Sequence, residues 1–148
     1  MLGRVLTAKS GYGNPEVEQV YSRARRLSEA VPEDANIFPV LLGSAIYSAV
    51  RAELVAGLEL SERLLELARQ KNDPLWIVEA HYARGIMHSW RGDFKEAREH
   101  LELAARDYRP ERHRAHLALY GQDPGPICLC RGAAVLWHVG YPDQGSPG

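Results

Sequence analysis

Apolar residues recur every three or four positions along most of the chain, the spacing that gathers them on one face of an α-helix. The pattern loosens between residues 110 and 126, where one more helical stretch, Arg112–Tyr120, is expected. The pattern therefore predicts an all-α fold. The other predicted helices run from Asn14 to Val31, Phe38 to Arg51, Leu54 to Lys71, Pro74 to Trp90, Phe94 to Tyr108 and Ile127 to Val139.

An Asn or Asp residue followed by proline marks the start of three predicted helices, at Asn14, Asp73 and Asp123. The short polar side chain can accept a hydrogen bond from a free backbone N–H of the first turn. Proline suits the first helical position, because its missing N–H would have no partner there. These pairs therefore favour helix starts at, or a few residues before, those that the apolar spacing predicts.

Short turns recur about every 40 residues, at Gly13, Ala52, Gly92 and Gly140, a period typical of helical repeat arrays. In such an array each helix pair buries its apolar face against its neighbours. The chain is thus expected to contain a leader at 1–13, about three helix pairs over 14–144 and a truncated tail at 145–148.

A set of small and apolar residues follows this pattern at Gly85, Gly92, Asp93, Phe94, Ala97, Leu101 and Ala104. Over Glu79–Tyr108 the chain resembles a tetratricopeptide repeat, although His81 and Arg84 depart from the usual apolar residues. Small side chains fit where paired helices approach to about 8–10 Å. The resemblance implies antiparallel helix pairs stacked into a right-handed superhelical array.

A second likeness is carried by Gly11–Gly13, Ala80-His81 with Gly85, Arg112–Arg114, Tyr120–Gly125, Leu136-Trp137 and Gly140–Gln144. These segments are similar to the C-terminal repeat region of large bacterial signalling proteins. Those proteins join an adenylate/guanylate cyclase or protein kinase domain to an AAA-type ATPase and then to tetratricopeptide-like repeats. No cyclase or ATPase motif occurs in this sequence, so the resemblance transfers no catalytic residue.

The charge balance argues against two classes of partner. With 18 basic and 19 acidic residues the net charge is −1, so neither nucleic acid nor an anionic membrane surface is an expected partner. No apolar run approaches the roughly 20 residues of a membrane span, and Met1–Leu6 is too short for a secretory signal. Cys128 and Cys130 would point about 200° apart on a helix, so a bridge between them is not expected and a cytoplasmic location is predicted.

Candidate chemistry is weak throughout the sequence. Gly3–Ser10 differs by one residue from a phosphate-binding loop, but the strand and helix that such a loop needs around it are not expected. His113 and His116, with Cys128 or Cys130, do not provide the three or four converging ligands of a zinc site. No nucleophile, base and orienting group occur together, so we expect no cofactor, no metal and no enzyme activity.

The expected function is therefore that of a non-catalytic scaffold that binds another protein or a peptide. In repeat arrays of this type the first helix of each pair lines the concave face, and Tyr82 is the strongest candidate for a contact because tyrosine buries a large area. Tyr82 could equally be a packing residue, as Trp76, Trp90 and Trp137 are expected to be. The predicted partner-binding residues are Tyr47, Arg51, Glu79, Tyr82, Ile86 and Ser89.

Two other functions are open. The chain could be a small-ligand sensor that regulates a linked ATPase, with Tyr47, Arg51 and Tyr82 as polar groups of a pocket. It could also be a truncated remnant without independent function, because repeat arrays need a polar terminal cap. The apolar face of Ile127–Val139 predicts self-association, which replacing Leu136 and Val139 by glutamate should abolish.

Overall fold

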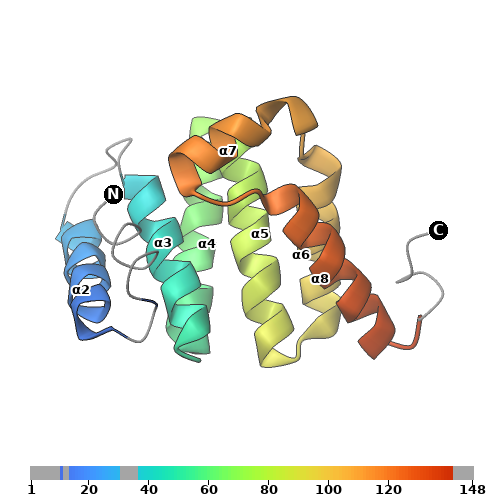
Figure 1. Cartoon of the computed structure of the whole chain (residues 1–148), viewed down its shortest axis with the longest axis horizontal. Helices are drawn as coiled ribbons and strands as arrows, with labels where there is room; N and C mark the ends of the chain where they lie inside the picture. The colour runs from blue at the N-terminus through green and yellow to red at the C-terminus, as the bar shows by residue number, and fades with distance from the viewer. Residues whose placement is uncertain (1–10, 12–13, 31–36, 142–148) are drawn as a thin grey trace.

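The computed structural model describes residue 11, residues 14–30 and residues 37–141, without the side chains of residues 24, 25 and 27–30. Most of the expected leader 1–13, including the Gly3–Ser10 segment, lies outside the described residues, as does the expected tail 145–148. All regular structure in the described residues is helical (Figure 1), so the predicted all-α class is confirmed.

The helices follow the apolar spacing closely. The predicted helix Leu54–Lys71 is found with these bounds, and the last helix begins at Pro124, three residues before the predicted start. The elements are α2 (Pro15–Ala30), α3 (Ile37–Val50), α4 (Leu54–Lys71), α5 (Pro74–Arg91), α6 (Phe94–Asp107), the short 3-10 helix η1 (Pro110–Arg112), α7 (His113–Tyr120) and α8 (Pro124–His138).

The three predicted Asx-Pro helix starts are confirmed. Asn14, Asp73 and Asp123 each accept a hydrogen bond from the backbone amide two residues later, at 2.8, 2.8 and 3.2 Å. Each bond gives a partner to one of the amides that the first turn of a helix leaves free. The earlier start of α8 follows from this contact at Asp123.

Tight turns connect the central helices. Asn72 (φ 49°) ends α4 and Gly92 (φ 89°) ends α5, both in the left-handed region, and α5 and α6 begin two residues later. Such short connections reverse the chain, so α4, α5 and α6 pack as antiparallel neighbours. At the α3–α4 turn Ala52 has a φ of 58°, which is unusual for a residue with a side chain.

Two glycines allow the helices to approach closely. A Cβ atom on Gly85 would lie 2.7 Å from Cγ of Leu101 in α6, and one on Gly57 of α4 would collide with the sulfur of Met87 in α5. Neither position can hold a larger side chain without moving its neighbour. The requirement for a small residue at Gly85, inferred from the sequence, is confirmed.

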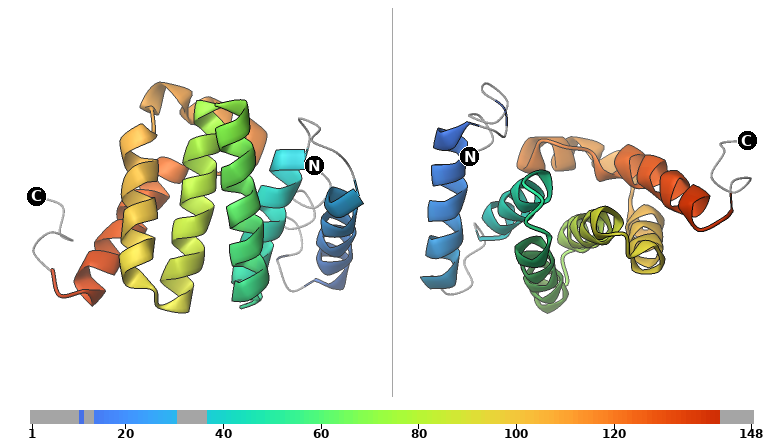
Figure 2. Two further views of the ribbon diagram at one scale, coloured as in Figure 1. Left: turned by 180° about the vertical axis from the view of Figure 1, so that it is seen from behind. Right: turned by 90° about the horizontal axis from the view of Figure 1, so that it is seen from below.

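The helices stack in chain order with one interruption. Each of α2 to α5 contacts the helix that follows it, α3 also contacts α5, and α8 packs directly on α6 and α5. The connection between α6 and α8 contains α7, which lies over α3 and α5 on the side away from α4 (Figures 1 and 2). The short helix α7 therefore covers part of the stack instead of extending it.

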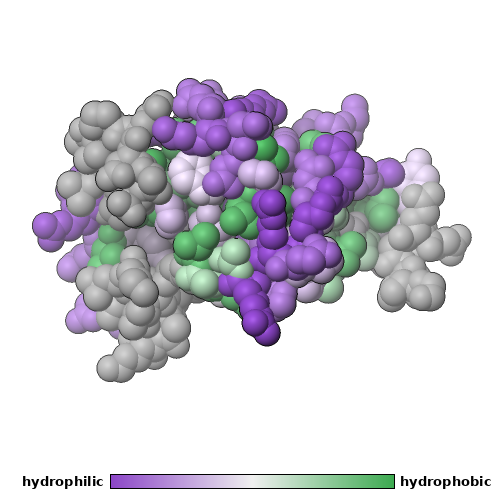
Figure 3. All heavy atoms as spheres, turned by 90° about the horizontal axis from the view of Figure 1, so that it is seen from above, coloured by the Kyte–Doolittle hydropathy of each residue, from purple (hydrophilic) through white to green (hydrophobic). Residues whose placement is uncertain are grey.

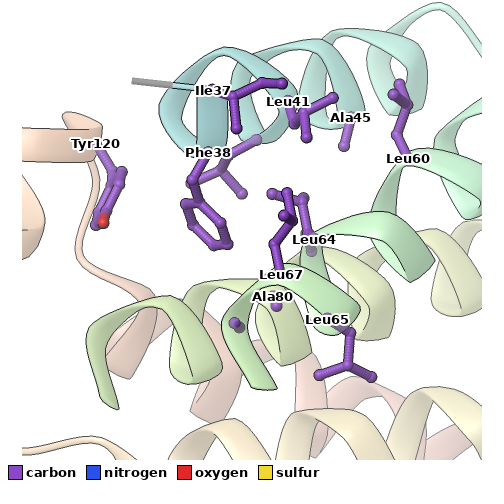
Figure 4. Close-up of a cluster of buried hydrophobic side chains, with 13 residues drawn as sticks. Ile37, Phe38, Leu41, Ala45, Leu60, Leu64, Leu65, Leu67, Ala80 and Tyr120 are labelled. Atoms are coloured by element: carbon purple, nitrogen blue, oxygen red, sulfur yellow. The ribbon is translucent and has the colours of Figure 1, made fainter. Parts of the chain in front are cut away.

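The core consists of two main clusters. One lies between α3, α4 and α5 and includes Phe38, Leu41 and Leu64, with Tyr120 of α7 at its edge (Figure 4). The second joins α5, α6 and α8 through residues such as Met87 and Leu101. The central helices thus bury apolar side chains on both sides.

The three tryptophans differ in their surroundings. Trp76 stacks on Phe38 with ring centroids 4.4 Å apart, as a packing residue would. Trp90 and Trp137 are 49% and 67% exposed, so the prediction that they pack is wrong. Trp90 lies at the end of α5 beneath the guanidinium of Arg131, and Trp137 lies on the side of α8 that faces away from α6.

Candidate functional site

The segment His113–Asp123, which we call the α7 cover, lies across α3 and α5. Two side chains of α7 are buried, His116 and Tyr120. They lie four residues apart and hence on the same face of the helix. The α7 cover therefore contacts the stack through one narrow face. The surface of the molecule seen from above is polar over most of its area, with smaller apolar areas between (Figure 3).

The α7 cover places a histidine on a buried carboxylate. Glu79 of α5 has no exposed surface and His116 is 1% exposed, and the two atoms Nδ1 of His116 and Oε1 of Glu79 lie 2.6 Å apart. Nε2 of Gln122 donates to the other carboxylate oxygen at 3.3 Å, and the Tyr82 hydroxyl donates to Oε1 of Gln122 at 3.4 Å. Both oxygens of Glu79 thus have a donor from the α7 cover.

Burial controls the charge of this carboxyl group. It raises the pKa of Glu79, while the hydrogen bonds from His116 and Gln122 act in the opposite direction by stabilising the ionised form. A carboxylate in such a place is tolerated because it is hydrogen-bonded. The donors of the α7 cover are therefore a condition for keeping Glu79 in the core.

An aromatic contact holds the other end of α7. The ring of Tyr120 meets the ring of Phe38 edge to face, with centroids 6.1 Å apart, and the two side chains lie side by side in the close-up (Figure 4). Phe38 in turn stacks on Trp76. Such pairs contribute about 0.5–1.5 kcal/mol beyond the area that they bury.

The predicted partner-binding residues do not form one open face. Arg51 is exposed and Ser89 partly so, but the other side chains are buried by different parts of the chain. Their role in binding remains a prediction. Tyr47 stacks on Tyr21 of α2, Glu79 and Tyr82 lie under the α7 cover, and Ile86 belongs to the cluster with Val135 of α8.

A second polar cluster lies between α5 and α6. The Nδ1 atoms of His81 and His100 are 2.9 Å apart, and Nε of Arg84 donates to Nε2 of His100 at 3.1 Å. Arg84 also forms an ion pair with Glu62 of α4. Since arginine can only donate, Nε2 of His100 accepts, and the proton of His100 lies on Nδ1 and is donated to His81.

This arrangement requires two neutral imidazoles. Burial lowers the pKa of His100 to about 4, helped by the positive charges of its neighbours, and burial also lowers the pKa of His81. A further proton on His100 would place an N–H against the N–H of Arg84. The pair therefore resists protonation in the folded chain.

The residues that the sequence offers as metal ligands do not meet. His113 contacts the carbonyl oxygen of Pro110 at 3.0 Å, whereas His116 turns inward to Glu79. Burial raises the pKa of the Cys128 thiol to about 12, which keeps it protonated. Among the residues that the structure describes, no three His, Cys, Asp or Glu side chains come together as a metal site would require.

The outer face of α8 is apolar, and its side chains are exposed or only partly buried. We define it by Leu129, Cys130, Ala133, Leu136 and Trp137. Leu129 and Trp137 are each 67% exposed, and the opposite side of α8 packs through Cys128 and Val135. Exposed large apolar side chains on one face often indicate an interaction surface.

Sequence reasoning missed the roles of His116, Gln122 and His100. The first two lie in the stretch where helical periodicity weakens, and His100 reads as one polar residue among many on α6. One signal was present: His116 and Tyr120 are spaced as on one helix face. That spacing alone does not identify Glu79 as the partner.

None of the helices in the described part of the chain is long and apolar enough to cross a membrane. No family model matches the chain, and no curated protein and no solved structure matches it.

Proposed function

We propose that this chain is a non-catalytic module that binds another protein or a peptide, built as a tetratricopeptide-like array of helix pairs. Support for the array comes from the tight turns between α4, α5 and α6, the contact of α3 with α5, and the close approaches at Gly57 and Gly85. Helices that each contact only near neighbours are typical of repeat proteins. The proposed setting, a signalling protein with a cyclase or kinase domain and an ATPase, rests on the sequence resemblance.

The outer face of α8 is the observation that carries this proposal. Its leucine and tryptophan side chains are held on a helix that packs firmly through its other side, so the face is presented in a fixed form. Aromatic anchors on a preformed surface supply much of the binding energy in protein interfaces. We propose that this face binds the surface of another protein. In a purified sample the chain itself is the protein present, so we expect a second copy of the chain to bind there.

Replacing Leu129 and Trp137 together by glutamate should convert a self-associated protein to a monomer. Two charges would have to be buried without partners at the contact, which costs more than the contact gains. These positions are better suited to the test than Leu136, which is partly buried. Sedimentation velocity over a range of concentrations measures the change in mass.

The matched control replaces Leu117 and Leu119 of α7 by glutamate, since these leucines are also about half exposed, at 47% and 49%. This variant should keep the mass of the wild-type chain. A mass that is the same in all three proteins would contradict a role of the α8 face in self-association. If the wild-type chain unfolds on heating without a cooperative transition, the result would instead favour the alternative that the chain is a truncated remnant without independent function.

A second candidate function, a small-ligand sensor, is supported by a cavity of about 240 Å³ between α2 and α3. Its hydroxyl and carboxylate groups favour a small organic cation such as a polyamine. Spermidine at a hundredfold excess over its dissociation constant should then raise the unfolding free energy by about 2.7 kcal/mol, and an unchanged melting temperature would contradict this function. The cavity is lined by Glu18, Tyr21, Ser22, Ser44, Tyr47, Ser48 and Glu53.

A further inference from the structure

We propose that the face of α3 and α5 beneath the α7 cover is a second binding site, closed by the chain's own α7. Its partner is a helix of another protein that carries an imidazole or ammonium group four residues before an aromatic ring. The inference rests on the proposed function, because it assigns a second surface to the same interaction module. The site is separate from the outer face of α8, so the two can be tested independently.

The α7 helix shows what this face accepts. His116 and Tyr120 enter the face, while Arg114, Leu117, Ala118 and Leu119 remain exposed. With eight residues, α7 is shorter than the roughly 12–15 residues that an isolated helix needs in water. Its helical form therefore depends on the face that it covers, as expected for a segment that can fold on and off.

Glu79 sets the chemistry of the partner. Its carboxylate has no exposed surface, and its oxygens are 2.6 Å from Nδ1 of His116 and 3.3 Å from Nε2 of Gln122. Since a carboxylate can only accept hydrogen bonds, a segment that replaces α7 must bring a donor to the same place. A purely apolar helix would leave the carboxylate without a partner and would be rejected.

The second anchor is aromatic. Phe38 stacks on Trp76 and meets the edge of the Tyr120 ring at a centroid distance of 6.1 Å. A ring four residues after the donor would reach this pair, because residues four apart lie one above the other on a helix. The spacing of donor and ring thus specifies the direction in which the partner helix lies.

The α7 cover can leave without dismantling the stack. Helix α8 packs directly on α6 and α5, and Gly125 at its start lies against the ring of Tyr108, close enough that a Cβ atom would be 2.6 Å from it. The position of α8 is therefore fixed by its contacts with α5 and α6 and by the contact of Gly125 with Tyr108, and it does not depend on α7. Two short segments join α7 to the stack: the 3-10 helix η1 before it and residues 121–123 after it.

The test is exchange of α7 for a peptide in solution. The probe is a fluorescein-labelled peptide with the sequence of residues 109–123, and the proteins are the full wild-type chain, H116A/Y120A, and the control L117A/L119A. Fluorescence anisotropy should show at least tenfold tighter binding to H116A/Y120A than to the other two proteins, because its own α7 no longer competes. A probe with the same histidine and tyrosine replaced by alanine should not bind.

Equal binding to all three proteins, or none to a folded H116A/Y120A, would overturn the proposal. Hydrogen exchange on the wild-type chain provides a readout that does not depend on the variant. Amides of α7 should exchange by local opening at least tenfold faster than those of α5, and exchange of both at the global unfolding rate would also overturn it. A wild-type dimer that H116A/Y120A abolishes would assign the face to a second copy and refute a foreign helix as the partner. Failure of the α8 test leaves each of these results unaffected.

Discussion

Replacing His116 by alanine should lower the free energy of unfolding by about 3–5 kcal/mol, the cost of breaking one partner of a buried pair. The substitution removes the donor that lies 2.6 Å from Oε1 of Glu79. While α7 stays docked through Tyr120, the carboxylate remains buried beneath it and loses the hydrogen bond that offsets its burial. Urea denaturation monitored by circular dichroism measures the change.

Two further variants separate the carboxylate from simple loss of packing. Replacing Glu79 by methionine together with His116 by leucine removes the carboxyl group and the imidazole at similar volume, and it should recover most of the lost stability. His113→Ala, on the same helix but bonded to the carbonyl of Pro110, should change stability little. A double variant as unstable as His116→Ala would show that the loss is one of shape and not of charge.

Lowering the pH from 7 to 5 should destabilise the chain by about 1 kcal/mol through His100 alone, after a discount for its partial exposure to solvent. In the unfolded chain His100 takes up a proton near pH 6.5, whereas in the folded chain its pKa is lowered to about 4. The unfolded state therefore binds more protons between these values, and stability is lost as the pH falls through that window. His81, whose pKa is also lowered, acts in the same direction.

The surroundings of the pair support this sign. Positive groups of the neighbouring helices, among them Arg69 of α4 and Arg84 of α5, disfavour a proton on either ring, whereas Asp107 favours one on His81. Glu79 changes the stability in the opposite direction. Burial raises its pKa, so its protonation at lower pH removes part of the free-energy cost of burying a charged carboxylate. The measurement is therefore the difference between wild type and His100→Gln in unfolding free energy at pH 7 and at pH 5. Identical pH dependence in the two proteins would contradict the role of His100.

Most helices were predictable because local signals agree with each other. Around α5, for example, Asp73 caps the first turn, Pro74 suits it, and the left-handed Gly92 ends it. The small residue at Gly85 could also be predicted, since it repeats a pattern of close helix approach. These features depend on residues within a few positions of one another, which a single sequence records directly.

The site itself could not be predicted in the same way. The bond between His116 and Glu79 joins residues 37 positions apart, and no periodicity connects them. On α5 alone, Glu79 reads as a polar residue on the face where partners bind, and only the path of the chain after α6 buries it. Trp137 is the opposite case, because its size favours packing while its position on α8 places it in solvent.

The position of α7 also has a consequence for the order of folding. Helices α4, α5 and α6 are joined by connections of two residues and pack on their sequence neighbours, and local contacts of this kind form early. The contact of His116 with Glu79 must close a much longer loop, which costs more chain entropy. A newly formed chain should therefore pass through an intermediate stage in which the central helices are assembled, Glu79 is still hydrated, and the face of α3 and α5 is briefly open.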